Sequence, residues 1–152
     1  MDLYTDENEI IKKNPPRLHI GIDYGLARIG VAISETGQLA RPFCVIRNKG
    51  DKKNLLQIAD IIKKFSHTTL YSVVSSHTTP LVVLGLPAGT LAPECKRFGE
   101  ILKNELGVDI DYENEHLSSV HAEEYIRKTN SKEFVDEVAA AVILNSYLER
   151  RK

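Results

Sequence analysis

The chain has 152 residues, and its 20 Lys and Arg nearly balance its 21 Asp and Glu, for a formal net charge of −1. This balance excludes a strongly basic protein that coats nucleic acid by bulk charge, and the 42% hydrophobic content is typical of one globular domain. No apolar run approaches the ~18 residues of a membrane-spanning helix, and the polar, acidic start is unlike a secretion signal. We therefore expect a cytoplasmic protein with no membrane partner.

The first half of the chain predicts three strands and a helix. Residues 1–16 are polar and end in Asn14-Pro15-Pro16, so we expect a flexible N-terminal tail and a single folded domain over 17–152. Apolar residues at three- and four-residue steps predict a helix over about 52–64. Before it, three β-branched runs joined by short turns predict an antiparallel meander: LHIGIDY (18–24), IGVAIS (29–34) and RPFCVIR (41–47).

The second half alternates strands and helices. LVVLGLP (81–87) is a continuous apolar run, typical of a strand buried in a parallel sheet. Residues 67–79 remain open between a helix extension, a loop and an edge strand. The later elements are a helix with Pro93 in its first turn and Gly107 at its end, a strand (108–114) and two helical stretches (about 119–128 and 134–150). This order predicts an α/β fold with a mixed sheet and helices on its faces.

The first candidate site residue is Asp23, at the end of the first strand. Gly25 follows two residues later and permits a positive φ, so the backbone turns away and leaves a carboxylate placed to hold a cation. The alternative is that Asp23 only caps a turn, because Asp-x-Gly turns are common. Arg28, on the turn or at the start of the next strand, faces either a phosphate or solvent.

A second acidic segment, Glu113-Asn114-Glu115-His116-Leu117-Ser118, follows the strand over 108–114. Ligands of α/β sheets gather at the carboxyl ends of parallel strands, so a carboxylate here can approach Asp23. Counting residues along the strand does not decide whether Glu113 or Glu115 points inward. Ser118 and its neighbour Ser119 either contact a ligand or cap the next helix.

The third candidate is Asp136, in the last predicted helix. It shares a helix face with an apolar stripe that should pack on the sheet, made of Ala139, Ala140, Ile143 and Tyr147. A carboxylate on such a stripe is costly unless something pairs with it. The alternative is a first-turn Asp favoured by the helix dipole.

Three acidic positions at two strand ends and one helix start have one physical explanation in common, a divalent metal site. Converging carboxylates repel one another, and Mg²⁺ prefers oxygen ligands and relieves that repulsion. Two such ions ~3.5–4 Å apart activate a water and stabilise the leaving oxygen in phosphodiester cleavage.

Other familiar sites are not indicated. The five histidines show no zinc-site spacing, Cys44 and Cys95 form no CxxC pair, and the chain contains no P-loop, GxGxxG or GxSxG motif. We expect the two cysteines to be reduced, partly buried thiols. Basic clusters such as Lys49/Lys52/Lys53 either form solvated faces or follow a phosphate backbone locally.

Four segments together resemble the family of Holliday-junction resolvases also described as pre-16S rRNA nucleases, within the RNase H-like superfamily. They are GIDYGLARIGVAIS, LVVLGLP, YENEHLSS and VDEVAAAVILNSYL, and the resemblance covers about 18–148. It implies an RNase H-like fold with a five-stranded sheet, three antiparallel strands followed by parallel crossovers, flanked by helices.

By that resemblance, Asp23, Glu115 and Asp136 are the catalytic residues that bind Mg²⁺ or Mn²⁺, which selects Glu115 over Glu113. Arg28, His116 and Ser118 are then the substrate-binding residues. The chain departs from the family pattern at Asn114, where Asp is usual, and at His116, where Arg is usual. The loss of that Arg removes a bidentate phosphate donor.

The resemblance implies a metal-dependent nuclease that acts on phosphodiester bonds, with nucleic acid as its partner. The expected role is processing of the 5′ end of pre-16S rRNA in ribosome biogenesis. The alternatives are resolution of branched DNA in recombination and repair, or a ribosome-assembly factor that binds nucleic acid without cutting it. A monomer and a homodimer are both compatible with the sequence.

Overall fold

The computed structural model describes residues 17–66, 79–115 and 135–151. Its elements, in chain order, are β1 (His19–Tyr24), β2 (Arg28–Ser34), β3 (Arg41–Arg47), α2 (Asp51–Ser66), β4 (Leu81–Leu86), α4 (Leu91–Leu106), β5 (Asp109–Asn114) and α6 (Val135–Arg150). Within these segments, no helix is both long enough and apolar enough to cross a membrane.

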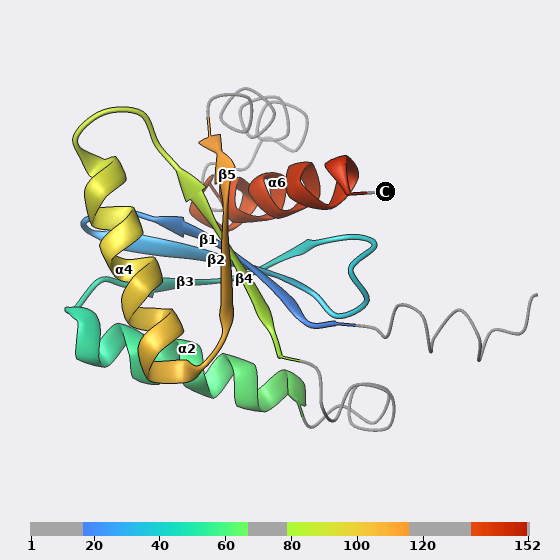
Figure 1. Ribbon diagram of the computed structural model, residues 1–152, viewed down its shortest axis with the longest axis horizontal. Helices are drawn as coiled ribbons and strands as arrows, with labels where there is room; N and C mark the ends of the chain where they lie inside the picture. The colour runs from blue at the N-terminus through green and yellow to red at the C-terminus, as the bar shows by residue number, and fades with distance from the viewer. Residues whose placement is uncertain (1–16, 67–78, 116–134, 152) are drawn as a thin grey trace, which may run out of the picture.

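The strands form one mixed five-stranded sheet in the order β3-β2-β1-β4-β5 (Figure 1). β1 and β2 pair antiparallel, as do β2 and β3, whereas β4 runs parallel to both β1 and β5. The carboxyl ends of β1, β4 and β5 therefore lie at the same edge of the sheet. The start of β2 lies at that edge too, because β2 is antiparallel to β1.

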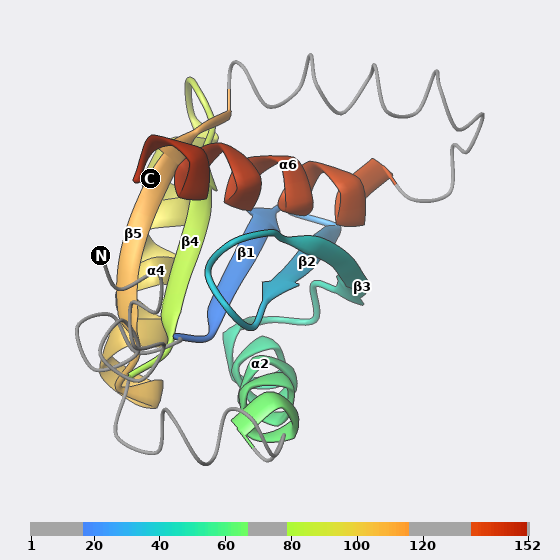
Figure 2. The same cartoon turned by 90° about the vertical axis from the view of Figure 1, so that its right-hand side faces the viewer.

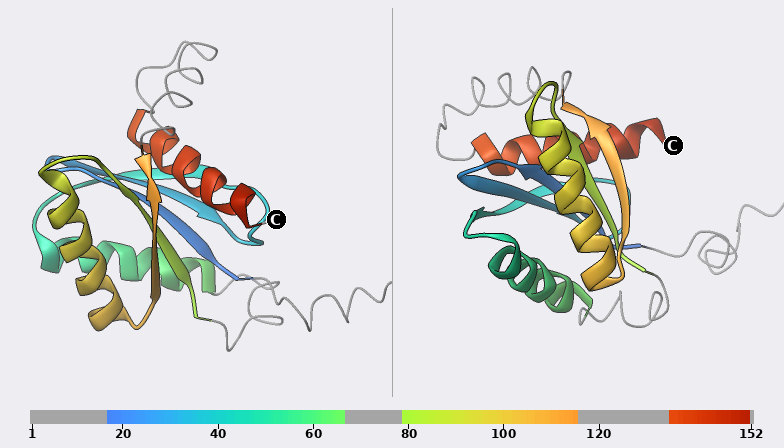
Figure 3. Two further views of the ribbon diagram at one scale, coloured as in Figure 1. Left: turned by 45° about the horizontal axis from the view of Figure 1, so that its top comes forward. Right: turned by 60° about the vertical axis from the view of Figure 1, so that its left-hand side comes forward.

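The described helices cover both faces of the sheet. α6 crosses one face, and α2 and α4 lie together on the other (Figures 2 and 3). The core on the α2/α4 face is large and apolar and includes Ile20, Ile22, Leu84 and Phe98. The sequence prediction of a mixed, helix-flanked five-stranded sheet is confirmed.

Element boundaries differ from the predictions by a few residues. α4 begins at Leu91, so Pro93 lies in its first turn as predicted, and Gly107 ends the helix with a left-handed φ of 66°. α2 begins at Asp51 and extends to Ser66. The predicted helix over 119–128 and nearly all of the open segment 67–79 lie outside the described residues.

α6 rests on a track of glycines. A Cβ atom on Gly30 of β2 would lie 1.9 Å from the Asp136 carbonyl oxygen, and one on Gly21 of β1 would lie 2.7 Å from the Ala140 carbonyl oxygen. No side chain fits at either position without moving the helix. The track lets the backbone of α6 approach the sheet closely and brings Asp136 over β2, beside the end of β1.

We predict that Gly30→Ala lowers the free energy of unfolding by about 2 kcal/mol, because the added methyl group overpacks a backbone contact that cannot yield. Urea unfolding followed by circular dichroism measures this change. Leu56→Ala, at an exposed position of α2, is the control and should change stability by less than about 0.5 kcal/mol. Equal stabilities for Gly30→Ala and the unaltered protein would contradict the close packing of α6.

Candidate active site

Asp23 is the fifth residue of β1, and its side chain points to the α6 face of the sheet. Its neighbours Ile22 and Tyr24 point to the opposite face and are buried there. Gly25, which follows β1, does not adopt a positive φ. It is needed for space instead, since a Cβ there would lie 2.5 Å from the Arg28 carbonyl oxygen. The tight turn therefore leaves Asp23 at the sheet edge.

The structure places Glu115 beside Asp23, at the end of β5, and the two carboxyl groups share a hydrogen bond. Gly85 of β4 makes room for this contact, because a Cβ there would lie 2.7 Å from both Cγ and Oε1 of Glu115. Glu113 lies elsewhere: it is buried and paired with Arg150 of α6 at 2.5 Å. The choice of Glu115 over Glu113 thus agrees with the geometry.

The hydrogen-bonded pair holds a proton at neutral pH. Burial raises the pKa of Glu115 to about 8, and the hydrogen bond to Asp23 and its negative charge act in the same direction. Burial also raises the pKa of Asp23, the hydrogen bond from Glu115 opposes that rise, and the charge of Asp136 adds to it. The two carboxyl groups therefore share one proton between them.

Asp136 lies close enough to Asp23 to act on it through its charge, but its own side chain turns to Arg28. The Arg28 Nε atom lies 3.2 Å from Asp136 Oδ2, with the Arg28 side chain largely exposed. The structure thus brings Asp23, Glu115, Asp136 and Arg28 to one edge of the sheet. His116 and Ser118 lie outside the described residues.

The donor chemistry at this edge suits a hard divalent cation. Three carboxyl groups supply the oxygen ligands that Mg²⁺ and Mn²⁺ prefer, and their mutual repulsion is what a cation relieves. In the described part of the chain, however, no three His, Cys, Asp or Glu residues are arranged closely enough to hold a metal ion. The proton on Glu115 and the guanidinium of Arg28 neutralise part of the charge that a cation would balance.

Cys95 lies next to the acidic pair, but its thiol is unreactive. Its Sγ donates a hydrogen bond to the Gly85 carbonyl oxygen at 3.2 Å. Burial raises the pKa of this thiol to about 12, with further contributions from the charges of Glu115 and Asp23. A neutral thiol is a poor nucleophile, so the sulfur has a packing role.

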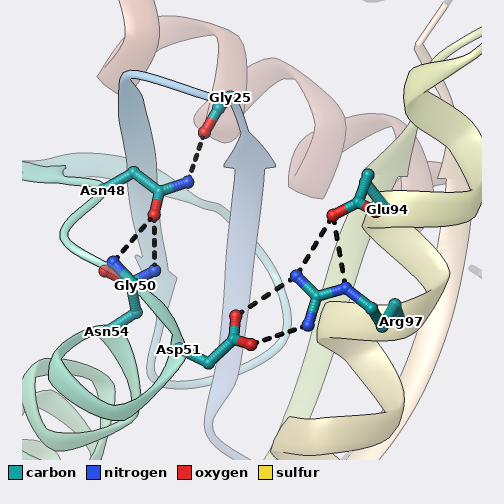
Figure 4. Close-up of polar contacts among 7 residues, drawn as sticks. All are labelled: Gly25, Asn48, Gly50, Asp51, Asn54, Glu94 and Arg97. Atoms are coloured by element: carbon teal, nitrogen blue, oxygen red, sulfur yellow. Dashed lines mark hydrogen bonds and ion pairs between the residues drawn. The ribbon is translucent and has the colours of Figure 1, made fainter.

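Two asparagines hold the turn after Asp23 in place through hydrogen bonds (Figure 4). The Asn48 side-chain amide donates to the Gly25 carbonyl oxygen at 2.9 Å, and the backbone N–H of Asn48 donates to the Ala27 carbonyl oxygen at 3.0 Å. Asn54, fully buried in the first turn of α2, donates to Asn48 Oδ1 at 2.9 Å and accepts from the Lys49 N–H. We call Asn48 and Asn54 the amide relay.

Gly85 and the amide relay were not predicted as site residues. A glycine inside a buried strand is a recognised sign of close approach by another group, so the LVVLGLP run carried that signal. Asn54 had no such signal, because an Asn that follows two lysines in a helix is usually exposed.

We predict that the metal-free protein loses stability between pH 5 and pH 8.5, by about 1–2 kcal/mol after allowance for partial solvation of the site. Glu115 has a folded-state pKa above its ordinary 4.5, so folding takes up a proton here. That contribution is complete below the unfolded pKa and is lost as pH rises through about 8. Unfolding in EDTA at several pH values measures it.

Glu115→Gln should remove most of this pH dependence, because the amide does not titrate. Glu105→Gln, at an exposed position of α4, is the matched control and should retain it. A pH profile that is the same in Glu115→Gln and the unaltered protein would show that another group causes the change.

For the amide relay, we predict that Asn54→Ala lowers the free energy of unfolding by about 1–3 kcal/mol, because buried hydrogen-bonding groups are left without their partner. Arg97→Gln is the control. Arg97 belongs to the exposed ion pairs with Asp51 and Glu94 in the same view (Figure 4), and its loss should cost less than about 1 kcal/mol. A larger loss in Arg97→Gln than in Asn54→Ala would contradict this ranking.

Comparison with known proteins gives a consistent family. The sequence model of one family, described as "RuvX: Holliday junction resolvase", matches residues 17–150. A "Putative pre-16S rRNA nuclease" of Endomicrobium trichonymphae is 33% identical over 143 residues, which cover 86% of this chain and 94% of that protein. A protein of the same name from Clostridioides difficile is 32% identical over 142 residues, covering 86% and 92%.

Among solved structures, "T. thermophilus RuvC in complex with Holliday junction substrate" matches with a TM-score of 0.56 and 14% identity, over 89% of this chain and 95% of that one. This similarity confirms the RNase H-like fold. The match of the family model to residues 17–150 and the identity with these relatives mean that the chain belongs to the RuvX family of nucleases.

Proposed function

We propose that this protein is a metal-dependent endonuclease that processes the 5′ end of pre-16S rRNA. The observation that carries the proposal is the hydrogen-bonded pair of Asp23 and Glu115, with Asp136 beside it, at the carboxyl edge of the sheet. The name shared by the relatives in the RuvX family supports the same activity and substrate.

In this proposal, Asp23, Glu115 and Asp136 hold Mg²⁺ or Mn²⁺. A metal held there would lower the pKa of a water molecule and stabilise negative charge on the leaving oxygen. Glu115 must give up the proton that it shares with Asp23 before its carboxylate acts as a ligand. Asp136 must turn from Arg28, and Arg28 then binds a substrate phosphate with its guanidinium.

His116 and Ser118 are proposed as further substrate contacts, on the resemblance alone. A neutral His116 would donate a single hydrogen bond where the family's usual Arg offers a bidentate fork. Action on rRNA would place the protein in the cytoplasm, as a monomer or a homodimer.

The second candidate substrate is branched DNA. The description of the RuvX family as Holliday junction resolvases favours it. Both substrates require the same phosphodiester chemistry, so the residues named above would have the same roles.

We predict that the protein cleaves a pre-16S rRNA fragment in Mg²⁺ and that Asp23→Asn lowers the cleavage rate by at least about 100-fold, because a metal ligand is lost. Gel analysis of an end-labelled fragment measures the rate. Asp60→Asn, at an exposed position of α2, is the matched control and should cleave at the normal rate. A four-way DNA junction is tested side by side with the RNA.

Mn²⁺ binding by calorimetry separates the enzyme from a non-catalytic binding factor. We expect binding by the unaltered protein and by Asp60→Asn, and weak or no binding by Asp23→Asn and Asp136→Asn. Cleavage of the four-way DNA junction but not of the RNA would mean that branched DNA is the substrate. Absence of both cleavage and Mn²⁺ binding in the unaltered protein would overturn the proposal.

A further inference from the structure

Two arginines face each other across neighbouring strands at the edge of the sheet that carries Asp23. Arg28, the first residue of β2, is the direct partner of Arg47, the last residue of β3, in the antiparallel register. Both residues are exposed. Directly opposed residues point to the same face and have neighbouring Cβ atoms, so the two side chains leave the backbone next to each other and both guanidinium groups can reach one ligand.

The two arginines lie on the same face of the sheet as the acidic groups. Arg28 and Gly30 point to the same side of β2 because side chains alternate along a strand. Gly30 contacts the backbone of Asp136, and it is the register partner of Asp23 in β1. The arginine pair therefore lies on the α6 face, one step beyond Asp23 along the sheet edge.

This arrangement costs stability, because like charges directly opposite each other in a sheet repel. Asp136 neutralises Arg28 only. Within residues 17–66, 79–115 and 135–151, Arg47 forms no ion pair and no side-chain hydrogen bond. By contrast Arg41, at the other end of the same strand, pairs with Glu35 at 3.2 Å. Arg47 is thus an exposed side chain whose charge no described residue neutralises, at the edge of the sheet that carries the proposed active site.

The spacing of the pair is fixed by hydrogen bonds from Asn48, which follows Arg47 directly. Its backbone N–H bonds the carbonyl oxygen of Ala27, the residue before Arg28, and its side chain bonds Gly25. The amide relay then ties Asn48 to the fully buried Asn54. The two arginines project from a backbone frame that is already rigid, which lowers the entropy lost when a ligand binds between them.

We propose that Arg28 and Arg47 together form a site for an internucleotide phosphate of the substrate strand, a short distance along the backbone from the bond that is cut. Two planar guanidinium groups offer several N–H donors to one phosphate and supply the positive charge that the near-neutral chain lacks in bulk. This inference rests on the proposed nuclease function and adds Arg47 to the substrate contacts.

The test measures binding rather than cleavage. The dissociation constant of an end-labelled pre-16S rRNA fragment is determined in EDTA at several salt concentrations, for the unaltered protein, Arg47→Gln and Arg41→Gln. We expect Arg47→Gln to weaken binding about 5- to 10-fold near 0.1 M salt and to reduce the slope of log K against log salt by about 0.7–0.9, the value for one lost phosphate contact. Arg41→Gln, the matched control, should change neither.

Three further variants, Arg47→Lys, Arg28→Gln and the double variant, test whether the two arginines share one phosphate. Arg47→Lys keeps the positive charge but loses the paired N–H donors of the guanidinium group. Its dissociation constant for RNA should therefore lie between those of Arg47→Gln and the unaltered protein. Arg28→Gln combined with Arg47→Gln should weaken binding by less than the product of the two single effects, because both groups contact one phosphate. Thermal unfolding of Arg47→Gln should show equal or higher stability, since the repulsion with Arg28 is relieved.

Four other results separate a failure of this inference from a failure of the proposed function. Unchanged RNA binding in Arg47→Gln removes Arg47 from the site, while RNA cleavage by the unaltered protein still supports the proposed function. Equal losses of RNA affinity in Arg47→Gln and Arg41→Gln would mean that general surface charge, and not a site at Arg47, causes the effect. Binding of a four-way DNA junction but not of RNA would support the phosphate site and would mean that the substrate is branched DNA. Absence of binding to either nucleic acid overturns both proposals.

Discussion

The backbone contact between α6 and the sheet is the constraint on which the candidate site depends. Gly21 and Gly30 remove the side chains that would hold the helix away from β1 and β2. An ordinary sheet face carries side chains that hold a packed helix about 10 Å away. Without that layer, the first turn of α6 reaches the edge of the sheet, and Asp136 lies within electrostatic range of Asp23. One packing choice thus places acidic groups from distant parts of the chain together.

Because the carboxyl groups lie close together, their negative charges repel one another. The described residues reduce this repulsion in two different ways. One negative charge is removed by the proton that Glu115 shares with Asp23, and another is balanced by Arg28. Both solutions are reversible, because a proton can leave and an exposed arginine side chain can rotate. An arginine buried among these carboxylates would have held them in place permanently, but the side chain of Arg28 is 67% exposed. The edge of the sheet is therefore neutralised without being closed to a cation.

Much of this structure could be predicted from the sequence, because strands and helices here follow strong local patterns. The buried run of β4, the helix end at Gly107 and the apolar stripe of α6 were all visible locally. The choice between Glu113 and Glu115 was not, since Glu115 lies just beyond the last residue of β5, where the alternation of a strand no longer sets direction. For Gly85 the sequence indicates a close approach but not which group approaches, because Glu115 lies on another element, and for Asn54 no local pattern indicates burial.

Asn48 joins the two halves of the edge, the carboxylate side and the arginine side. Through Gly25 it fixes the turn that follows Asp23, and through Ala27 it fixes the residue before Arg28, while Arg47 is its own neighbour in the chain. A shift of this one residue would therefore move the acidic group and both arginines together rather than separately. Because the frame is anchored in the fully buried Asn54, the relative positions of the acidic and basic groups are set by the core of α2. Precision at an exposed edge is in this way obtained from partly buried hydrogen bonds that end on a fully buried side chain.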